Sequence, residues 1–207
     1  MEELKIVQVN YWKEMRKEIK KTFDSLHGLV LLTHNSIEFS DLIDFLNKLR
    51  RNQETTVLYI SLINSYSHIK QTLLTHPLPS KKLYIVDCVS GSLLELQDKV
   101  DCVYQRPPSN LREMKNLIMK NIQWANPNII IVDSISQFIN FSLPTEEQQH
   151  SFYAFLKSIK EDALGITHDV IILVYNDKMG SMKKLPTLFT DTIMKLEVIK
   201  EKIKWED

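Results

Sequence analysis

The sequence predicts an α/β fold in which helices cover both faces of a mostly parallel central sheet. Short apolar runs alternate with longer segments of helical period, which is the order expected of βαβ units. The apolar runs do not alternate with polar residues, so both faces of each strand are expected to be buried. The chain has 207 residues, of which 43% are hydrophobic and 25% charged, and this is typical of one globular domain.

Five apolar runs are expected to form the buried strands of this sheet. They are Gly28–Thr33, Thr56–Ser61, Lys82–Cys88, Ile129–Asp133 and Asp169–Tyr175. A sixth segment, Asp191–Ile199, differs because its apolar residues alternate with Lys195 and Glu197. One apolar and one polar face indicate a half-exposed strand at the edge of the sheet.

Four segments between the strands have the period of amphipathic helices. They are Ser36–Arg51, Ser65–Thr75, Asn110–Ala125 and Thr145–Ala163. The last segment begins with Thr145 and Gln148 at the spacing of a capping box, and Ser36 is the expected N-cap of the first.

A further amphipathic helix is expected at about residues 10–26, ahead of the first strand. Its apolar residues, at helical spacing, are Trp12, Met15, Ile19, Phe23 and Leu26. Lysines and an arginine occupy the other faces, but glutamates dilute this charge, so we expect packing on the protein's own sheet rather than on a membrane. With a core at about residues 28–199 and no internal repeat, residues 1–207 are expected to form a single domain.

Composition argues against several classes of partner and cofactor. The 26 Lys and Arg residues balance 26 Asp and Glu residues, so no overall field attracts nucleic acid or an anionic membrane. Cys88 and Cys102 belong to no CxxC motif and the six histidines to no HExxH motif, so neither a metal nor another cofactor is expected. Because no signal-peptide core and no apolar run of about 18 residues occurs, the protein is expected in the cytoplasm.

The strongest candidate for a functional residue is Asp133, which ends the apolar run within Asn128–Ser136. In open α/β sheets, ligands bind beyond the carboxyl ends of the strands. Asp133, with Ser134 beside it, matches a Walker B aspartate, which holds magnesium. An aspartate in this position also commonly caps the next helix, and the isolated pattern favours this structural role.

The order of segments around Asp133 resembles the core of RecA-superfamily ATPases, and most of all the KaiC-type branch common in archaea and bacteria. An amphipathic helix, the Pro127-Asn128 turn, the run IIIVDSIS, a long helix and the run DVIILVY follow one another as in that family. The resemblance extends over about residues 28–198. It implies a three-layer RecA-like fold of the P-loop NTPase type, with the sheet between two layers of helices.

The sequence departs from this family where the phosphates of a nucleotide would bind. Working members carry G-x-x-x-x-G-K-[ST] after the first strand, and its amides and lysine cradle the phosphates. The corresponding residues here are Leu32, Thr33, His34, Asn35, Ser36, Ile37, Glu38 and Phe39. Bulky aliphatic residues replace the glycines, and Glu38 stands where the lysine belongs. No Lys or Arg occurs between Gly28 and Leu46, so this degenerate Walker A segment is not expected to bind nucleotide.

The end of the second strand departs as well. In the KaiC-type branch this strand usually ends in two acidic residues, one of which orients the attacking water, whereas here it ends in Ile63 and Asn64. Isoleucine cannot accept a proton, so no catalytic residue is expected and Asp133 is a residual Walker B position. The interpretation is a pseudo-ATPase that acts as a regulatory or scaffolding protein, in contact with itself or with an active RecA-family relative.

A recombination-mediator-like protein that binds DNA is the main alternative. RecA-like recombinases contact DNA through the loop that corresponds to Asn176–Pro186, and the candidate phosphate contacts there are Lys178, Lys183 and Lys184. The neutral overall charge favours a solvated loop instead.

An enzyme that uses polar residues at the strand ends is the third interpretation. Asp87 and Asp133 are candidates for a carboxylate pair, and Ser61, His34 and Asp133 for a hydrolytic triad. No GxSxG elbow accompanies the serine, so the sequence favours helix caps and turn-formers at these positions.

Overall fold

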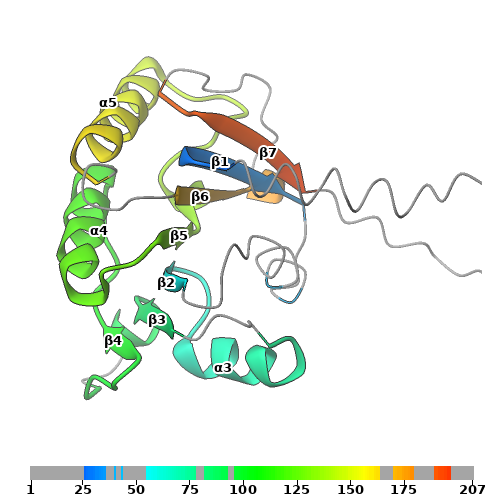
Figure 1. Ribbon diagram of the computed structural model, residues 1–207. Coiled ribbons are helices and arrows are strands. Elements are labelled where there is room, and N and C mark those ends of the chain that lie inside the picture. Colours follow the sequence, from blue (N-terminus) through cyan, green and yellow to red (C-terminus); the bar gives the residue numbers. More distant parts are fainter. Residues whose placement is uncertain are drawn as a thin grey trace, which may run out of the picture.

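The computed structural model describes residues 26–35, 40, 43, 55–77, 82–92, 96–163, 170–179 and 189–196. Seven strands in these ranges form one sheet in the order β4-β3-β2-β5-β6-β1-β7, and each neighbouring pair is parallel (Figure 1). The strands are β1 (Gly28–His34), β2 (Thr56–Ser61), β3 (Lys82–Asp87), β4 (Cys102–Tyr104), β5 (Ile129–Asp133), β6 (Val170–Asn176) and β7 (Thr192–Leu196). The expected α/β class with a parallel sheet is therefore confirmed.

The observed strands lie where the apolar runs predict them. The alternating segment Asp191–Ile199 contains β7, which is at one edge of the sheet and half-buried, as its pattern indicates. The sequence pattern gives no sign of β4, because its three residues are too few to establish a period.

The helices of the described ranges begin at the capping residues that the sequence provides. They are α3 (Tyr66–Thr75), α4 (Leu111–Ala125) and α5 (Glu146–Asp162), capped by Ser65, Asn110 and Thr145. The predicted capping box of α5 is formed by Thr145 and Gln148. The helix expected at about residues 10–26 lies outside the described residues except for its last one. The same holds for most of Ser36–Arg51, including its expected cap.

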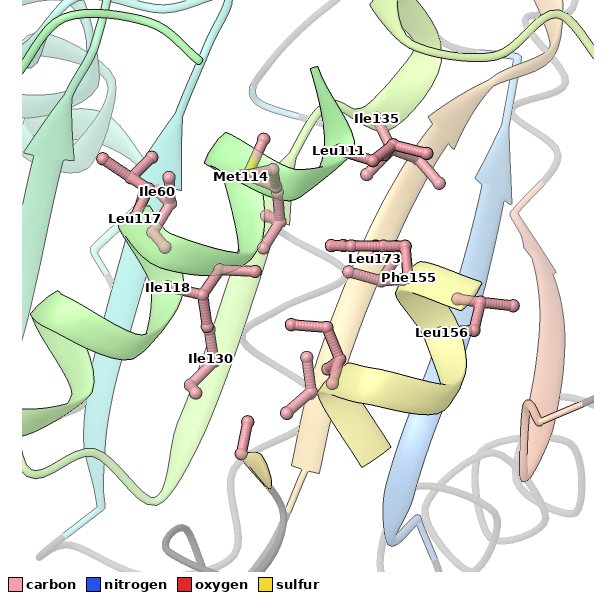
Figure 2. Packing of buried hydrophobic residues seen from close by; sticks show 14 of the residues in the cluster. Ile60, Leu111, Met114, Leu117, Ile118, Ile130, Ile135, Phe155, Leu156 and Leu173 are labelled. Carbon is pink, nitrogen blue, oxygen red and sulfur yellow. The ribbon is translucent and has the colours of Figure 1, made fainter. Parts of the chain in front are cut away.

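Two hydrophobic clusters fill the spaces on the two sides of the sheet. Helices α4 and α5 lie on one side (Figure 1), and Figure 2 shows Ile118 and Leu156 of these helices packed with Ile130 and Leu173 of the strands. Helix α3 and Ile43 pack with the strand side chains of the opposite face. Central strands are thus buried on both faces, which explains their unbroken apolar sequences.

The two edges of the sheet end differently. At the β4 edge, Lys99 and Cys102 exchange backbone hydrogen bonds, so the turn before β4 folds back along it. At the β7 edge, the carboxylate of Asp191 accepts the N–H of Leu29 at 2.9 Å, and the Asp191 N–H donates to the Leu29 carbonyl at 2.8 Å. Gly28 has φ +71° beside this carboxylate, and a Cβ there would lie 2.3 Å from an Asp191 oxygen. A side chain at this position would be strained and would require the Asp191 carboxylate to move.

Candidate functional site

Polar side chains end five neighbouring strands at the carboxyl edge of the sheet. They are His34 of β1, Ser61 of β2, Asp87 of β3, Asp133 of β5 and Asn176 of β6. Side chains alternate along a strand, so residues two apart point to the same face. The residue two positions before each of the five belongs to the hydrophobic cluster that includes α3, so all five lie on that face. The first four are buried and Asn176 is half-buried. The fold therefore gathers the predicted strand-end residues on one face.

The register of the sheet sets the separation of these residues. Ser61 pairs with Asp87 on one side and with Asp133 on the other, so the three lie at one level. Across β6, Asp133 is level with Leu32 of β1. His34 is therefore two residues beyond the level of Asp133 and two strands away, about 10 Å in the lateral direction alone.

The two carboxylate oxygens of the fully buried Asp133 have different surroundings. Oδ2 accepts a hydrogen bond from the hydroxyl of Tyr59. Oδ1 receives no hydrogen bond of normal geometry within the described part of the chain, although the side chain of Asn64 lies near enough to lower the pKa of Asp133. Burial has the larger effect and raises this pKa from its ordinary value of 3.8 to about 6. The carboxylate is only partly satisfied.

Asp133 does not cap the following turn, contrary to the structural role that the isolated pattern favours. The short 3-10 turn η2 (Ile135–Gln137) begins after Ser134, whose Oγ accepts the N–H of Ser136 at 3.1 Å. The Oγ of Ser136 accepts the N–H of Asn176 at 2.7 Å and so ties this turn to β6. Alternation along β5 directs the Asp133 side chain toward the face that carries Tyr59.

Asp87 holds the equivalent place on the other side of β2, but its carboxylate is engaged with the backbone. Oδ2 accepts the N–H of Tyr66 at 2.7 Å, and Oδ1 accepts the N–H groups of Val89 at 2.9 Å and Ser90 at 2.8 Å. The side chain thereby fixes the start of α3 and the turn after β3. Because β2 separates Asp87 from Asp133, the two do not form the carboxylate pair considered from the sequence.

Ser61 is committed to the turn after β2. Its Oγ donates to the carbonyl of Asn64 at 2.6 Å and accepts the Asn64 N–H at 3.1 Å. Strands β5 and β6 separate it from His34, so Ser61, His34 and Asp133 do not assemble into a triad. Within the same turn, the side chain of Ile63 is 53% exposed.

Strand β1 extends through the first residues of the segment predicted from the sequence to be a degenerate Walker A motif. Leu32, Thr33 and His34 pair with β6 on one side and with β7 on the other. A strand flanked on both sides has its backbone N–H groups bonded to its neighbours, so these amides are not available to a phosphate. Asn35 follows the strand, and the remaining residues of the segment, Ser36, Ile37, Glu38 and Phe39, lie outside the described residues.

The other candidates do not form a site in the described ranges. Lys178 is exposed in the turn after β6, while Lys183 and Lys184 fall outside those ranges. Cys88 and Cys102 are buried, and burial raises the pKa of both thiols to about 12. Among the described residues, no group of three or more His, Cys, Asp or Glu side chains is arranged to hold a metal ion. None of the described helices combines the length and hydrophobicity that crossing a bilayer requires.

Tyr59 belongs to this site although it is not among the residues predicted from the sequence. It is 1% exposed in the middle of β2 and pairs with Ile131, two residues before Asp133. A sequence signal does exist, because a tyrosine within an aliphatic strand needs a hydrogen-bond partner once it is buried. Its spacing of two from Ser61 places it on the same face as the strand-end residues.

Comparison with solved structures defines the architecture. A KaiC-like protein of the hyperthermophilic archaeon Pyrococcus horikoshii matches with a TM-score of 0.50 and 12% identity, over 86% of this chain and 74% of that one. The chain has the RecA-like fold of KaiC-like proteins. The flagellar accessory protein FlaH of Methanocaldococcus jannaschii matches with a TM-score of 0.43 and 16% identity, over 83% of this chain and 70% of its own. A DnaB-like replicative helicase matches with a TM-score of 0.39 and 10% identity, over 72% and 38%. No protein-family model and no curated protein matches the sequence, so the likeness is one of fold.

The RecA-like fold implies a magnesium–nucleotide complex at this edge of the sheet, and the residues present do not fit one. Magnesium retains several water molecules when it binds a carboxylate. Asp133 is fully buried, and the Tyr59 hydroxyl already occupies one of its oxygens. The amides of Leu32–His34 are part of the sheet. Among the residues that the structure describes, the donor set therefore lacks both a hydrated carboxylate and a phosphate cradle.

Proposed function

We propose that this protein is a RecA-like pseudo-ATPase that neither binds nor hydrolyses nucleotide and acts through protein contacts as a regulatory or scaffolding component. The observation that carries the proposal is the extension of β1 through His34, paired on both sides. A phosphate-binding loop requires converging free amides, and a strand inside a ladder has none to offer.

The charge pattern supports the same proposal. The segment after β1 carries Glu38 where a phosphate-binding lysine belongs, and no Lys or Arg occurs between Gly28 and Leu46. An uncompensated triphosphate would meet repulsion there instead of attraction. Hydrolysis also requires a group that orients water, and the residues in the turn after β2, Ile63 and Asn64, do not supply a base.

Ile63 is exposed at the carboxyl edge of the sheet, where the strands end, which we call the strand-end rim. Its exposure suggests how this rim is used. Ile63 is 53% exposed, whereas Ser61 beside it is buried and its hydroxyl is bonded to the Asn64 backbone. An apolar side chain at such a rim suits a protein surface rather than a charged ligand. The partner class that we propose is a second copy of this chain or an active protein of the same fold, docked over this rim.

Calorimetric titration with ATP and ADP, each with magnesium, tests the proposal. We expect no binding heat at millimolar nucleotide. ATP turnover that the Asp133→Ala substitution removes would refute it. A salt-dependent mobility shift of single-stranded oligonucleotide, lost in Lys183→Ala plus Lys184→Ala, would favour the DNA-binding alternative.

Light scattering, together with pull-down of an active protein of this fold, tests the contact surface. We expect Ile63→Asp to weaken the association about tenfold or more, because it places a charge in an apolar interface. Leu74→Asp is the matched control, since Leu74 is an 84% exposed leucine on α3. Equal effects of the two substitutions would argue against a contact at the strand-end rim.

A further inference from the structure

We infer that Tyr59 takes the place of a cation at Asp133, so that its hydroxyl is the resident partner of the carboxylate and locks β2 to β5. The inference rests on the proposed loss of nucleotide binding and deepens it, because it names what satisfies this carboxylate instead. It concerns a side chain that the RecA-like resemblance does not assign.

The register of the sheet builds the contact. Tyr59 pairs with Ile131, and Asp133 follows two residues later on the same face of β5. Diagonal neighbours of this kind are about 7–8 Å apart, a distance that a tyrosine ring spans. The hydroxyl thus reaches Oδ2 from within the sheet and does not depend on a loop.

Burial makes this partnership strong. Tyr59 and Asp133 are 1% and 0% exposed, so water does not compete for the hydrogen bond. A hydroxyl that donates to a carboxylate forms a charge-assisted bond, roughly twice as strong as a neutral one. Burial, with the charge of Asp133, raises the pKa of Tyr59 well above its ordinary value, so the hydroxyl keeps the proton that it donates.

A cation at Oδ2 would have to displace this hydroxyl. Magnesium keeps several of its waters, and a pair this deeply buried leaves no space for that shell. The second oxygen, Oδ1, has no hydrogen bond of normal geometry from the described residues. The side-chain amide of Asn64 nevertheless lowers the pKa of Asp133. The hydroxyl is therefore the one normal hydrogen-bond donor that the described residues give this carboxylate.

An internal partner has a consequence for switching. A ligand changes the population of conformations only when it binds them with different affinities and its concentration changes. The Tyr59 hydroxyl is always present at the same effective concentration. The strand ends then keep one conformation. Protein contacts at the strand-end rim therefore do not depend on magnesium or nucleotide.

Two experiments test the inference: a double-mutant cycle measured by urea unfolding, and a titration with manganese as the metal probe. We expect Tyr59→Phe to lower the urea midpoint of unfolding by about 0.5–1 M, because the buried carboxylate loses its donor. In the Asp133→Asn background the same substitution should lower the midpoint by less than half as much, since the charge is gone. The control is Tyr175→Phe, whose hydroxyl accepts the N–H of Phe141 and does not touch Asp133. Its effect should add to that of Asp133→Asn.

Each outcome decides between the proposals. If Tyr59→Phe does not fold alone, a double variant whose midpoint lies close to that of Asp133→Asn supports the inference as strongly as a measured cycle. Additive effects of Tyr59→Phe and Asp133→Asn would overturn it. Manganese binding by the wild-type protein with Kd below about 0.1 mM, lost in Asp133→Asn, would also overturn it and leave the proposed function intact. Nucleotide binding at millimolar concentration would instead refute the proposed function.

Discussion

Asp87 and Asp133 are two buried aspartates in matching places with opposite surroundings. They end the strands on either side of β2, at the same level and on the same face of the sheet. Asp87 accepts three backbone N–H groups, whereas Asp133 accepts one side-chain hydroxyl and has an oxygen without a normal hydrogen bond from the described residues. The chain that follows each strand makes the difference, because Ser134 replaces Asp133 as the cap of the next turn.

The comparison teaches that position in a sheet does not decide the role of a buried carboxylate. The number and type of its donors do. A carboxylate with a full set of backbone donors stabilises the fold that supplies them. A carboxylate without them reduces stability when it is ionised, and such residues are candidates for function.

The largest effect is expected for Asp87→Ala. The substitution leaves three N–H groups without an acceptor at a buried position, and we expect a loss of about 3–5 kcal/mol in the free energy of unfolding. Urea denaturation measures it. Asp98→Ala is the control, because Asp98 accepts a single N–H, from Tyr104, at an exposed site. A loss below about 1 kcal/mol for Asp87→Ala would show that these bonds are not structural.

The second prediction is the pH dependence that Asp133 causes. The folded pKa of about 6 is above the ordinary value of 3.8, so between about pH 4 and 6 the unfolded chain releases a proton that the folded protein keeps. Stability therefore falls as the pH rises through this window, by about 3 kcal/mol in total, and is level above it. Relative to wild type, Asp133→Asn should gain that amount over the same window. Urea unfolding at several pH values tests this, and a constant difference would contradict it.

Gly91→Ala is expected to have an intermediate effect. A Cβ at Gly91 would lie 2.4 Å from the carbonyl oxygen of Gln105, so the turn that presents Val89 and Ser90 to Asp87 must shift. We expect a loss of about 1–3 kcal/mol, measured by thermal or urea unfolding. Combined with Asp87→Ala, the loss should be less than additive, because both substitutions disrupt one contact set. If the two losses in stability were fully additive, the turn at Gly91 and the Asp87 carboxylate would stabilise the fold independently of each other.

The smallest effect is expected for Ser61→Ala, between the two aspartates. The Ser61 Oγ holds both backbone groups of Asn64, and their loss should lower stability by about 1 kcal/mol. Since the Asn64 side chain lowers the pKa of Asp133, loosening this turn should also move the midpoint of the pH dependence upward. An unchanged midpoint would mean that Asn64 is held in place by other contacts.

Most of the fold can be predicted from the sequence, because it depends on local patterns. Unbroken apolar runs give the buried strands, and capping residues such as Thr145 give the helix starts. Strand β4 escapes prediction because three residues carry no period. The RecA-like order of elements, read around Asp133, agrees with the fold comparison.

The site can be predicted only in part. Position in the chain identifies Asp133, but its relation to Tyr59 depends on the register between β2 and β5, which no single segment encodes. The same holds for Asp87, whose donors come from α3 and from the turn after β3. Sequence reasoning finds residues at the end of a strand, whereas their roles follow from neighbours distant in the chain.

The double link between Asp191 and Leu29 bears on protein engineering. Two hydrogen bonds, with Lys160 of α5 held on the same carboxylate at 2.5 Å, align β7 with β1 at the last residue before β7. Alignment is therefore independent of how many residues the connection contains, since it is re-established where the connection ends. Peptide tags or reporter sequences inserted between β6 and Phe189 should leave the sheet intact.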